Sequence, residues 1–191
     1  VTIPVYNSRS RKYEKWLLSG EYEAVSDDGN WITTSARQYR IKKADDITYI
    51  SPNLEPVMNT AASDKLCLSF KPVYSSERGE LSVIFGANSP KPNLDNSQNV
   101  NDRFELYFAN GKAILTSIVG GVETVLSEAR FTLSHNDFNK LEILTKNQNG
   151  QTLISCTING KIIFHTLSAR SIDKGYYGFL PGDTGILLEE V

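Results

Sequence analysis

Two glutamates in the N-terminal part of the chain have a spacing that suits carboxylate chemistry. Glu21 and Glu23 are separated by one residue, so on a β-strand both side chains would point to the same face. Retaining glycoside hydrolysis uses two carboxyl groups about 5–5.5 Å apart, one as nucleophile and one as acid/base. Exposed glutamates on the solvent face of a strand give the same pattern. We favour this solvent-face interpretation and keep Glu21 and Glu23 as the candidate catalytic pair.

A segment rich in asparagine is the candidate ligand-binding loop. Residues 86–103 form the longest break in the predicted strands, and loops longer than about 12–15 residues tend to be functional or disordered. Amide and carboxylate oxygens recur along this segment, and such groups hydrogen-bond the hydroxyl groups of sugars. We expect the ligand to contact Asn88, Asp95, Asn99 and Asn101.

The same loop is the candidate site for a cation. Calcium takes 6–8 oxygen ligands, and Asp95 and Asp102 would bring the negative charge. The loop lacks the glycine of an EF-hand loop, and a solvated loop held by its own turns explains the composition. We therefore expect no metal or other cofactor, with calcium as the alternative.

An aromatic platform is the other part of a typical sugar site, because a flat ring buries the apolar face of a pyranose. Trp31 follows the polar turn at residues 26–30 and begins a predicted strand. We take Trp31 as the candidate platform. Burial in the core is the competing interpretation, since large aromatic residues dominate protein cores.

Composition and motifs exclude several classes of function. The formal charge is −2, from 20 basic and 22 acidic residues, which gives no overall field to attract nucleic acid. No apolar stretch approaches the roughly 20 residues of a membrane-spanning helix. Spacings typical of zinc sites, P-loops, dinucleotide-binding folds and serine hydrolases are absent. The chain begins at Val1 without a basic and apolar leader, and we expect a secreted or cell-surface protein.

Alternation of apolar and polar residues predicts an all-β protein of many short strands. The turns between them include Asn110-Gly111, Asn149-Gly150 and Asn159-Gly160, dipeptides that favour tight hairpins. We expect one domain over residues 1–191, a sandwich of two antiparallel sheets. The predicted strands lie at residues 20–25, 31–34, 38–42, 47–50, 65–72, 80–86, 103–109, 112–119, 122–128, 140–146, 151–158, 161–166, 175–180 and 185–190.

At most one or two short helices are expected. The spacing of Tyr13, Trp16 and Leu17 is typical of one helix, and residues 54–62 are the other candidate. The two cysteines lie in predicted strands, where Cys67 should point away from the core and Cys156 into it. We expect both to be unpaired, because residues on opposite faces rarely meet disulfide geometry.

The C-terminal third of the chain has a Phe-Asn followed by an apolar-acidic-apolar strand (138–143), an Ile-Asn-Gly-Lys hairpin (158–161), a Lys-Gly-Tyr-Tyr-Gly-Phe strand (174–179) and a closing strand (186–191). In this order of motifs it resembles the concanavalin A-like lectin/glucanase superfamily, and within it the laminin-G-like and glycoside-hydrolase-associated modules. The resemblance implies a jelly-roll sandwich. The chain carries Phe138 where many such domains carry tryptophan, and it lacks the longer strand motif of the glucanases, which sets an aspartate among glutamates.

Together these features predict a carbohydrate-binding or adhesion module of an exported protein. The expected partner is a glycan or polysaccharide, with no nucleic acid and no membrane insertion, and with other domains of a larger surface protein as further partners. One alternative is a glycoside hydrolase that uses the paired glutamates. The other is a structural or partner-binding domain without a sugar site.

Overall fold

The computed structural model describes two sets of residues. Both backbone and side chains are described for residues 64–72, 80–88, 102–171, 175–182 and 185–189. The backbone alone is described for residues 2–7, 12–18, 22–25, 38–41, 48–52, 58–59 and 174.

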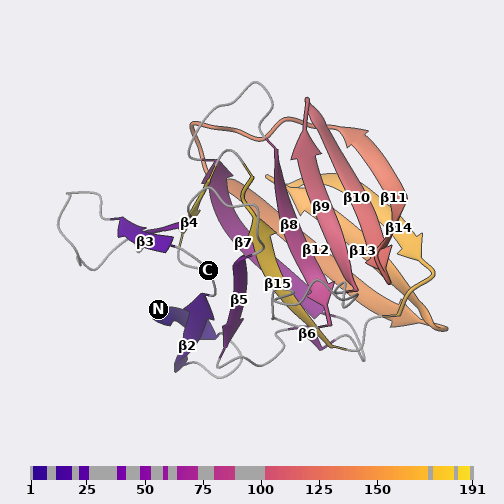
Figure 1. Ribbon diagram of the computed structural model, residues 1–191, viewed down its shortest axis with the longest axis horizontal. Helices are drawn as coiled ribbons and strands as arrows, with labels where there is room; N and C mark the ends of the chain where they lie inside the picture. The colour runs from indigo at the N-terminus through magenta and orange to yellow at the C-terminus, as the bar shows by residue number, and fades with distance from the viewer. Residues whose placement is uncertain are drawn as a thin grey trace.

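The described residues form sixteen strands and no helix (Figure 1). None of them therefore forms a helix able to cross a membrane. The strands are β1 (Thr2–Asn7), β2 (Lys12–Leu18), β3 (Tyr22–Val25), β4 (Gln38–Ile41), β5 (Thr48–Pro52), β6 (Met58–Asn59), β7 (Asp64–Pro72), β8 (Leu81–Ala87), β9 (Arg103–Ala109), β10 (Lys112–Val119), β11 (Val122–Arg130), β12 (Asn139–Gln148), β13 (Gln151–Ile158), β14 (Lys161–Ser168), β15 (Lys174–Leu180) and β16 (Ile186–Glu189).

Two antiparallel sheets pack face to face (Figure 1). The nine-stranded sheet has the order β1-β2-β5-β15-β8-β9-β10-β11, with β6 paired to β15. The seven-stranded sheet has the order β14-β13-β12-β7-β16-β4-β3. Strands distant in the sequence are neighbours in both sheets. The predicted all-β sandwich is confirmed.

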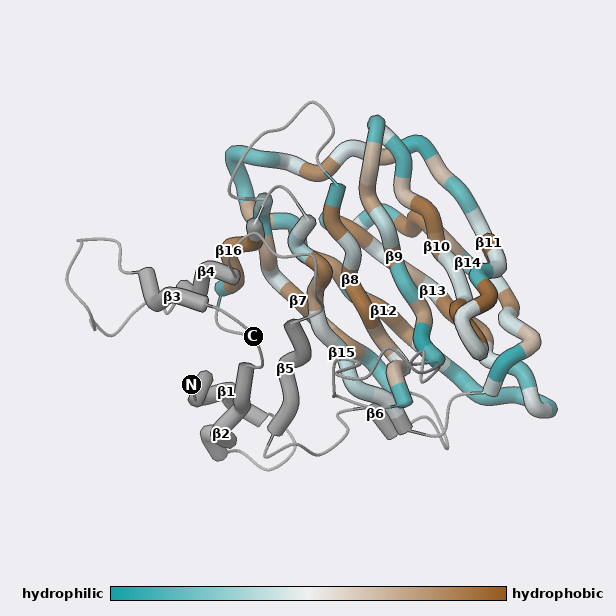
Figure 2. Tube along the Cα trace, in the orientation of Figure 1, coloured by the Kyte–Doolittle hydropathy of each residue, from teal (hydrophilic) through white to brown (hydrophobic). Residues whose placement is uncertain are grey.

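Aromatic side chains from both sheets fill the space between them. Phe70 of the seven-stranded sheet meets Phe179 of the nine-stranded sheet edge to face, with the ring centroids 5.4 Å apart. Phe85 and Phe104 stack at the same centroid distance within the nine-stranded sheet. Hydrophobic residues lie along the strands of both sheets, and hydrophilic ones gather at the connecting turns (Figure 2). Burial of these rings, with the aliphatic residues of the same core cluster, stabilises the fold.

The predicted hairpin turns are confirmed by their backbone angles. Asn110, Asn149 and Asn159 have φ of 50°, 53° and 51°, and each precedes a glycine that also has positive φ. Such turns match the twist of the flanking strands. The turns join β9 to β10, β12 to β13 and β13 to β14. They keep consecutive strands paired and so set their register.

The prediction of a helix around Tyr13, Trp16 and Leu17 is wrong, because residues 12–18 form strand β2. This strand pairs with β1 and β5, and long-range pairing overrides a weak local spacing. The second helix candidate contains the short strand β6 at Met58–Asn59, and its other residues lie outside the described ones. The strand predicted at residues 31–34 also lies outside them, and β1 was not predicted.

A buried asparagine closes the connection between the two sheets before β12. Asn139 is fully buried. Its Oδ1 accepts a hydrogen bond from the Ser134 N–H at 3.0 Å, and its Nδ2 donates to the Ser134 carbonyl at 2.9 Å and to the Phe70 carbonyl at 3.4 Å. One side chain thus satisfies three backbone groups where the chain enters the seven-stranded sheet.

Replacing Asn139 should destabilise the protein strongly. We expect Asn139→Ala to lower the free energy of unfolding by roughly 2–4 kcal/mol, because it leaves buried backbone groups without partners. Chemical unfolding followed by tryptophan fluorescence measures this change. Asn136→Ala, at an exposed position of the same connection, is the matched control and should change stability by less than about 0.5 kcal/mol. Equal losses in the two variants would contradict the assigned role.

The two cysteines should differ in reactivity. Both are free, with Cys67 exposed and Cys156 buried, as predicted, and burial raises the pKa of the Cys156 thiol to about 12. At pH 8 we expect a thiol reagent to label one cysteine in the native protein and two after unfolding, because the thiolate is the reactive form. Cys67→Ser should abolish the native labelling. Rapid labelling of that variant without unfolding would contradict the burial of Cys156.

Candidate functional site

The outer face of the nine-stranded sheet carries the most ordered polar cluster among the described residues. On β9, Phe104, Leu106 and Phe108 belong to the core, so the alternate residues point to the other face. We define this outer face by the residues that the strand registers place together on β8, β9 and β10: Ser82, Ile84, Arg103, Glu105, Tyr107, Ile114, Thr116 and Ile118.

The residues of this face are unusually inaccessible for positions that point away from the core. Ile84, Thr116 and Ile118 are only 0%, 2% and 7% exposed. Ile84 packs with Ala87 and Tyr176 in a small cluster separate from the main core. The outer face is therefore a packed floor with both apolar and polar parts.

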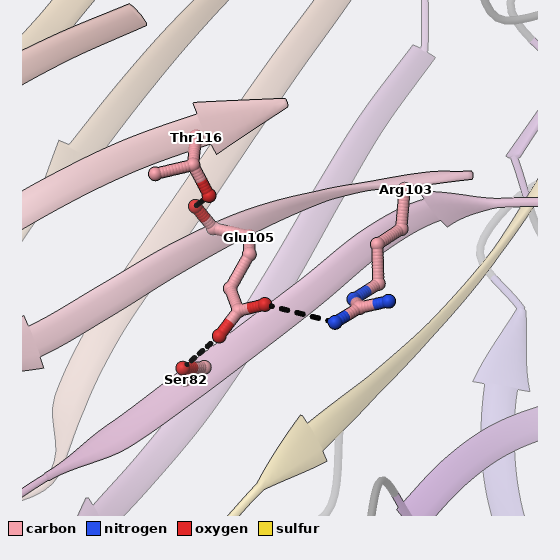
Figure 3. A network of polar contacts seen from close by, with 4 residues as sticks. All are labelled: Ser82, Arg103, Glu105 and Thr116. Carbon is pink, nitrogen blue, oxygen red and sulfur yellow. Dashed lines mark hydrogen bonds and ion pairs between the residues drawn. The ribbon is translucent and has the colours of Figure 1, made fainter. Parts of the chain in front are cut away.

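Glu105 is the centre of a hydrogen-bonded network on this floor (Figure 3). The Ser82 hydroxyl donates to Oε1 at 2.6 Å, and Arg103 Nη2 donates to Oε2 at 3.4 Å. The Thr116 hydroxyl donates to the Glu105 backbone carbonyl at 3.5 Å. The Arg103 and Glu105 side chains are 18% and 14% exposed. Contacts from β8 and β9 therefore hold the carboxylate in one orientation, and Thr116 of β10 binds the backbone of the same residue.

Tyr107 extends the polar floor along β9. Burial raises the pKa of the Tyr107 hydroxyl, and the charge of Glu80, its hydrogen bond with the tyrosine and the charge of Glu105 raise it further. The tyrosine lies opposite Ser82 in the register. The ring therefore stands beside the Glu105 network with its hydroxyl neutral and engaged by a second carboxylate.

The asparagine-rich loop has its two ends at the edge of the outer face. The Asn88 N–H donates to the Asp102 carbonyl at 3.1 Å, and Asp102 Oδ1 accepts from the Gly120 N–H at 2.8 Å. Asp102 is followed directly by Arg103. The ends of the loop thus lie together, beside the turn between β10 and β11 and next to the Glu105 network.

Arg170 supports this edge from the connection between β14 and β15. Its Nη2 donates to the Gly86 carbonyl at 3.1 Å, and its guanidinium lies 5.1 Å from the centroid of the Phe104 ring. Burial lowers the pKa of Arg170, and the charge of Asp102 partly offsets this. Arg170 therefore joins the end of β8 to the first core ring of β9.

Most residues predicted to form the site lie outside the described ones. These are Glu21, Trp31, Asp95, Asn99 and Asn101. Asn88 is described, and it is exposed at the end of β8. The backbone of Glu23 is in β3, at the edge of the seven-stranded sheet. Glu23 is therefore on a different sheet from Glu105.

No cation site emerges among the residues whose side chains are described. No group of three or more His, Cys, Asp or Glu side chains there is arranged to hold a metal ion. Asp102 uses one carboxylate oxygen for the Gly120 amide. Asp95, the other predicted ligand of calcium, lies outside the described residues.

The network around Glu105 was not predicted from the sequence. A usable signal was present, because Arg103, Glu105 and Tyr107 alternate with three core residues in a predicted strand. Ser82 precedes Glu105 by 23 residues, so its contribution depends on how β8 pairs with β9. Attention to the outward positions of the predicted strand could have found the glutamate but not its partners.

A small pocket lies at the end of β9, between the turn to β10 and residues 131–135. Its volume is about 80 Å³, well below the roughly 300–1,000 Å³ of typical ligand pockets. Phe108, Phe131 and Leu133 are among its lining residues. This pocket is too small to hold a sugar ring with its contacts, and the outer face remains the candidate site.

Comparison with known proteins defines the fold of the chain. No protein-family model matches the sequence, and no curated protein matches it significantly. The seed lectin of Lotus tetragonolobus matches with a TM-score of 0.57 and 12% identity, over 100% of this chain and 94% of that one. The carbohydrate-binding module CBM66 of Bacillus subtilis matches with a TM-score of 0.54 and 11% identity, over 92% and 95%.

An enzyme has the same architecture as these two binding proteins. The β-glucanase of Bacillus licheniformis matches with a TM-score of 0.52 and 11% identity, over 99% of this chain and 94% of that one. Structural similarity at sequence identities of 11–12% shows a shared fold and nothing about function. The chain has the concanavalin A-like lectin/glucanase fold, which carries both sugar-binding proteins and hydrolases.

The buried ion pair should couple more strongly than an exposed one. We expect a double-mutant cycle of Arg103→Met and Glu105→Gln to give a coupling free energy of about 1–3 kcal/mol in chemical unfolding. The control pair is Lys112–Glu128 on the same sheet, which is shorter at 2.7 Å but 48% exposed at both side chains. Its coupling should be about 0–1 kcal/mol. Similar coupling free energies in both cycles would contradict the expectation that burial strengthens the Arg103–Glu105 pair.

Proposed function

We propose that the protein binds carbohydrate on the outer face of its nine-stranded sheet, with Glu105 as the central hydrogen-bond acceptor. The observation that carries this proposal is the Ser82–Glu105–Arg103 network on a largely inaccessible floor. A sugar ligand needs a few polar groups in fixed positions within an apolar surrounding. The outer face offers this combination.

Glu105 has the capacity to accept further hydrogen bonds. Each carboxylate oxygen has two lone pairs, and one donor is assigned to each oxygen of Glu105 by the contacts to Ser82 and Arg103. Hydroxyl groups of a sugar would occupy the remaining positions. Because the carboxylate is already oriented, little conformational entropy would be lost on binding.

Tyr107 and Ile114 supply the apolar part of the proposed site, because they are only partly buried, whereas Ile84 and Ile118 are 0% and 7% exposed. Tyr107 follows Glu105 on the same face of β9, and Ile114 and Ile118 lie on the neighbouring β10. Aromatic and aliphatic surface of this kind packs against the C–H groups of a sugar ring. Trp31 and the loop residues Asn88, Asp95, Asn99 and Asn101 remain proposed contacts around this centre.

Binding is favoured over hydrolysis by the arrangement of the carboxylates on this face. Among the described residues, Glu80 directly precedes β8 and lies four residues from Ile84, the residue opposite Glu105. This places the two backbones about 13 Å apart along the strands, and Glu80 interacts with Tyr107. The two glutamates are therefore not at alternate positions of one strand, the arrangement that would set two carboxyl groups roughly 5–5.5 Å apart.

The fold comparison adds support from proteins whose names describe sugar binding. A seed lectin and a carbohydrate-binding module share the architecture over nearly their full length. Export or display on a cell surface, where polysaccharides are met, is part of the proposal. So is a place within a larger surface protein.

A screen against immobilised polysaccharides tests the proposal. We expect binding to at least one of a panel of glucan, mannan, galactan, fructan, pectate and heparin. Glu105→Gln should weaken this binding by about 10- to 100-fold in calorimetric titration, since hydrogen bonds to a charged group contribute most. Glu142→Gln is the matched control, because this glutamate lies on the seven-stranded sheet, paired with Lys65 at 2.9 Å. Binding that is equal for both variants would remove Glu105 from the site.

A partner-binding role is the second candidate, favoured by apolar residues on the outside of the seven-stranded sheet. Leu153 lies opposite Leu167, and Leu144 is diagonal to Leu153 on the adjacent strand. Leu144 and Leu167 are 46% and 48% exposed. Absence of binding to every polysaccharide of the panel would favour this face as the functional one.

A further inference from the structure

We infer that the outer face selects uncharged sugars and rejects those that carry carboxylate or sulfate groups. This inference rests on the proposed carbohydrate-binding function and adds the class of ligand. Two observations carry it. The Arg103 guanidinium already pairs with Glu105, and Glu80 and Glu105 lie beside Tyr107.

Arg103, the cation beside Glu105, already forms an ion pair. Arg103 pairs with Glu105 at 3.4 Å, and both side chains are at least four-fifths inaccessible. An acidic sugar that took the guanidinium would leave Glu105 as an inaccessible charge without its partner. Breaking one half of a largely buried pair is strongly unfavourable. Arg103, the described cation next to Glu105, is therefore not available to an anionic ligand at low cost.

Arg170, at the edge of this face, donates to the Gly86 carbonyl at 3.1 Å and lies over the Phe104 ring. The other cations described on this face are remote from Glu105 or already paired. Lys112 pairs with Glu128 at 2.7 Å, and Arg130 lies opposite Lys112 in the register. Lys112 is four residues from Thr116, the neighbour of Glu105 on β10. This separation corresponds to about 13 Å along the strand, which exceeds the screening length at physiological salt.

Among the described side chains, Tyr107 has a carboxylate on each side. Tyr107 stands between Glu105, two residues earlier on β9, and Glu80, with which it shares a hydrogen bond. A carboxylate or sulfate placed on the tyrosine ring would face both glutamates. Neutral hydroxyl groups would instead donate to the free lone pairs of Glu105. Repulsion of anionic groups by the two glutamates and the accepting capacity of the Glu105 carboxylate thus both favour uncharged sugars.

The test compares one polysaccharide in a neutral and a charged form. The neutral polysaccharide of the panel that binds most tightly is oxidised at its primary hydroxyls to carboxylates, and part of this product is methyl-esterified. We expect the carboxylated form to bind at least about tenfold more weakly at low salt and the difference to shrink at high salt. The methyl ester should bind like the parent, since it restores neutrality without restoring the hydroxyl.

Variants assign the effect to the proposed site. Glu105→Gln should reduce the discrimination between the two forms, whereas Glu142→Gln on the other sheet should leave it unchanged. Equal or tighter binding of the carboxylated form, or binding of pectate or heparin alone, would overturn the inference and leave the proposed function in place. A methyl ester as weak as the carboxylate would also overturn it, because loss of the hydroxyl would then be the cause. Absence of binding to any polysaccharide would overturn the proposed function and this inference with it.

Discussion

The packing of aromatic rings between the two sheets is the constraint on which the rest of the structure depends. Phe70 on one sheet meets Phe179 on the other, and Phe85 stacks on Phe104 within the nine-stranded sheet. Because side chains alternate along a strand, fixing Phe104 in the core forces Arg103 and Glu105 onto the outer face. A one-residue slip of β9 would bury the ion pair and expose three core residues. The core thus determines where the charged network lies.

Most of the described strands could be predicted from the sequence because their signals are local. Alternation and the Asn-Gly turns gave the strands from β7 to β16 to within a few residues, and the positive φ values of Asn110, Asn149 and Asn159 follow the expected turn chemistry. Local spacing failed at β2, where pairing with β1 and β5 decided the conformation. β1 is adjacent in the sequence, but β5 lies far beyond β2, and a partner so distant leaves no periodic trace.

The candidate site was less predictable than the fold, for a physical reason. Glu105 was visible as an outward residue of a predicted strand, but Ser82 and Thr116 join it only through the pairing of three strands. The residues chosen from composition, Trp31 and the asparagine-rich loop, fall mostly outside the described residues and remain predictions. Asn88 and Asp102, which are described, hold the ends of that loop together. Composition pointed to a loop whose ends lie beside the Glu105 network, but it did not identify the network itself.

The same fold carries lectins and a glucanase, so the difference between binding and catalysis has to lie in how the carboxylates are held. A catalytic acid must carry a proton on one oxygen and release it during the reaction. Both oxygens of Glu105 already accept a hydrogen bond, one from Ser82 and one from Arg103. Protonating the carboxylate would remove the charge that pairs with Arg103, whereas accepting a sugar hydroxyl would keep the ion pair. A carboxylate fixed in this way is suited to orienting a ligand, and its rigidity favours recognition over proton transfer.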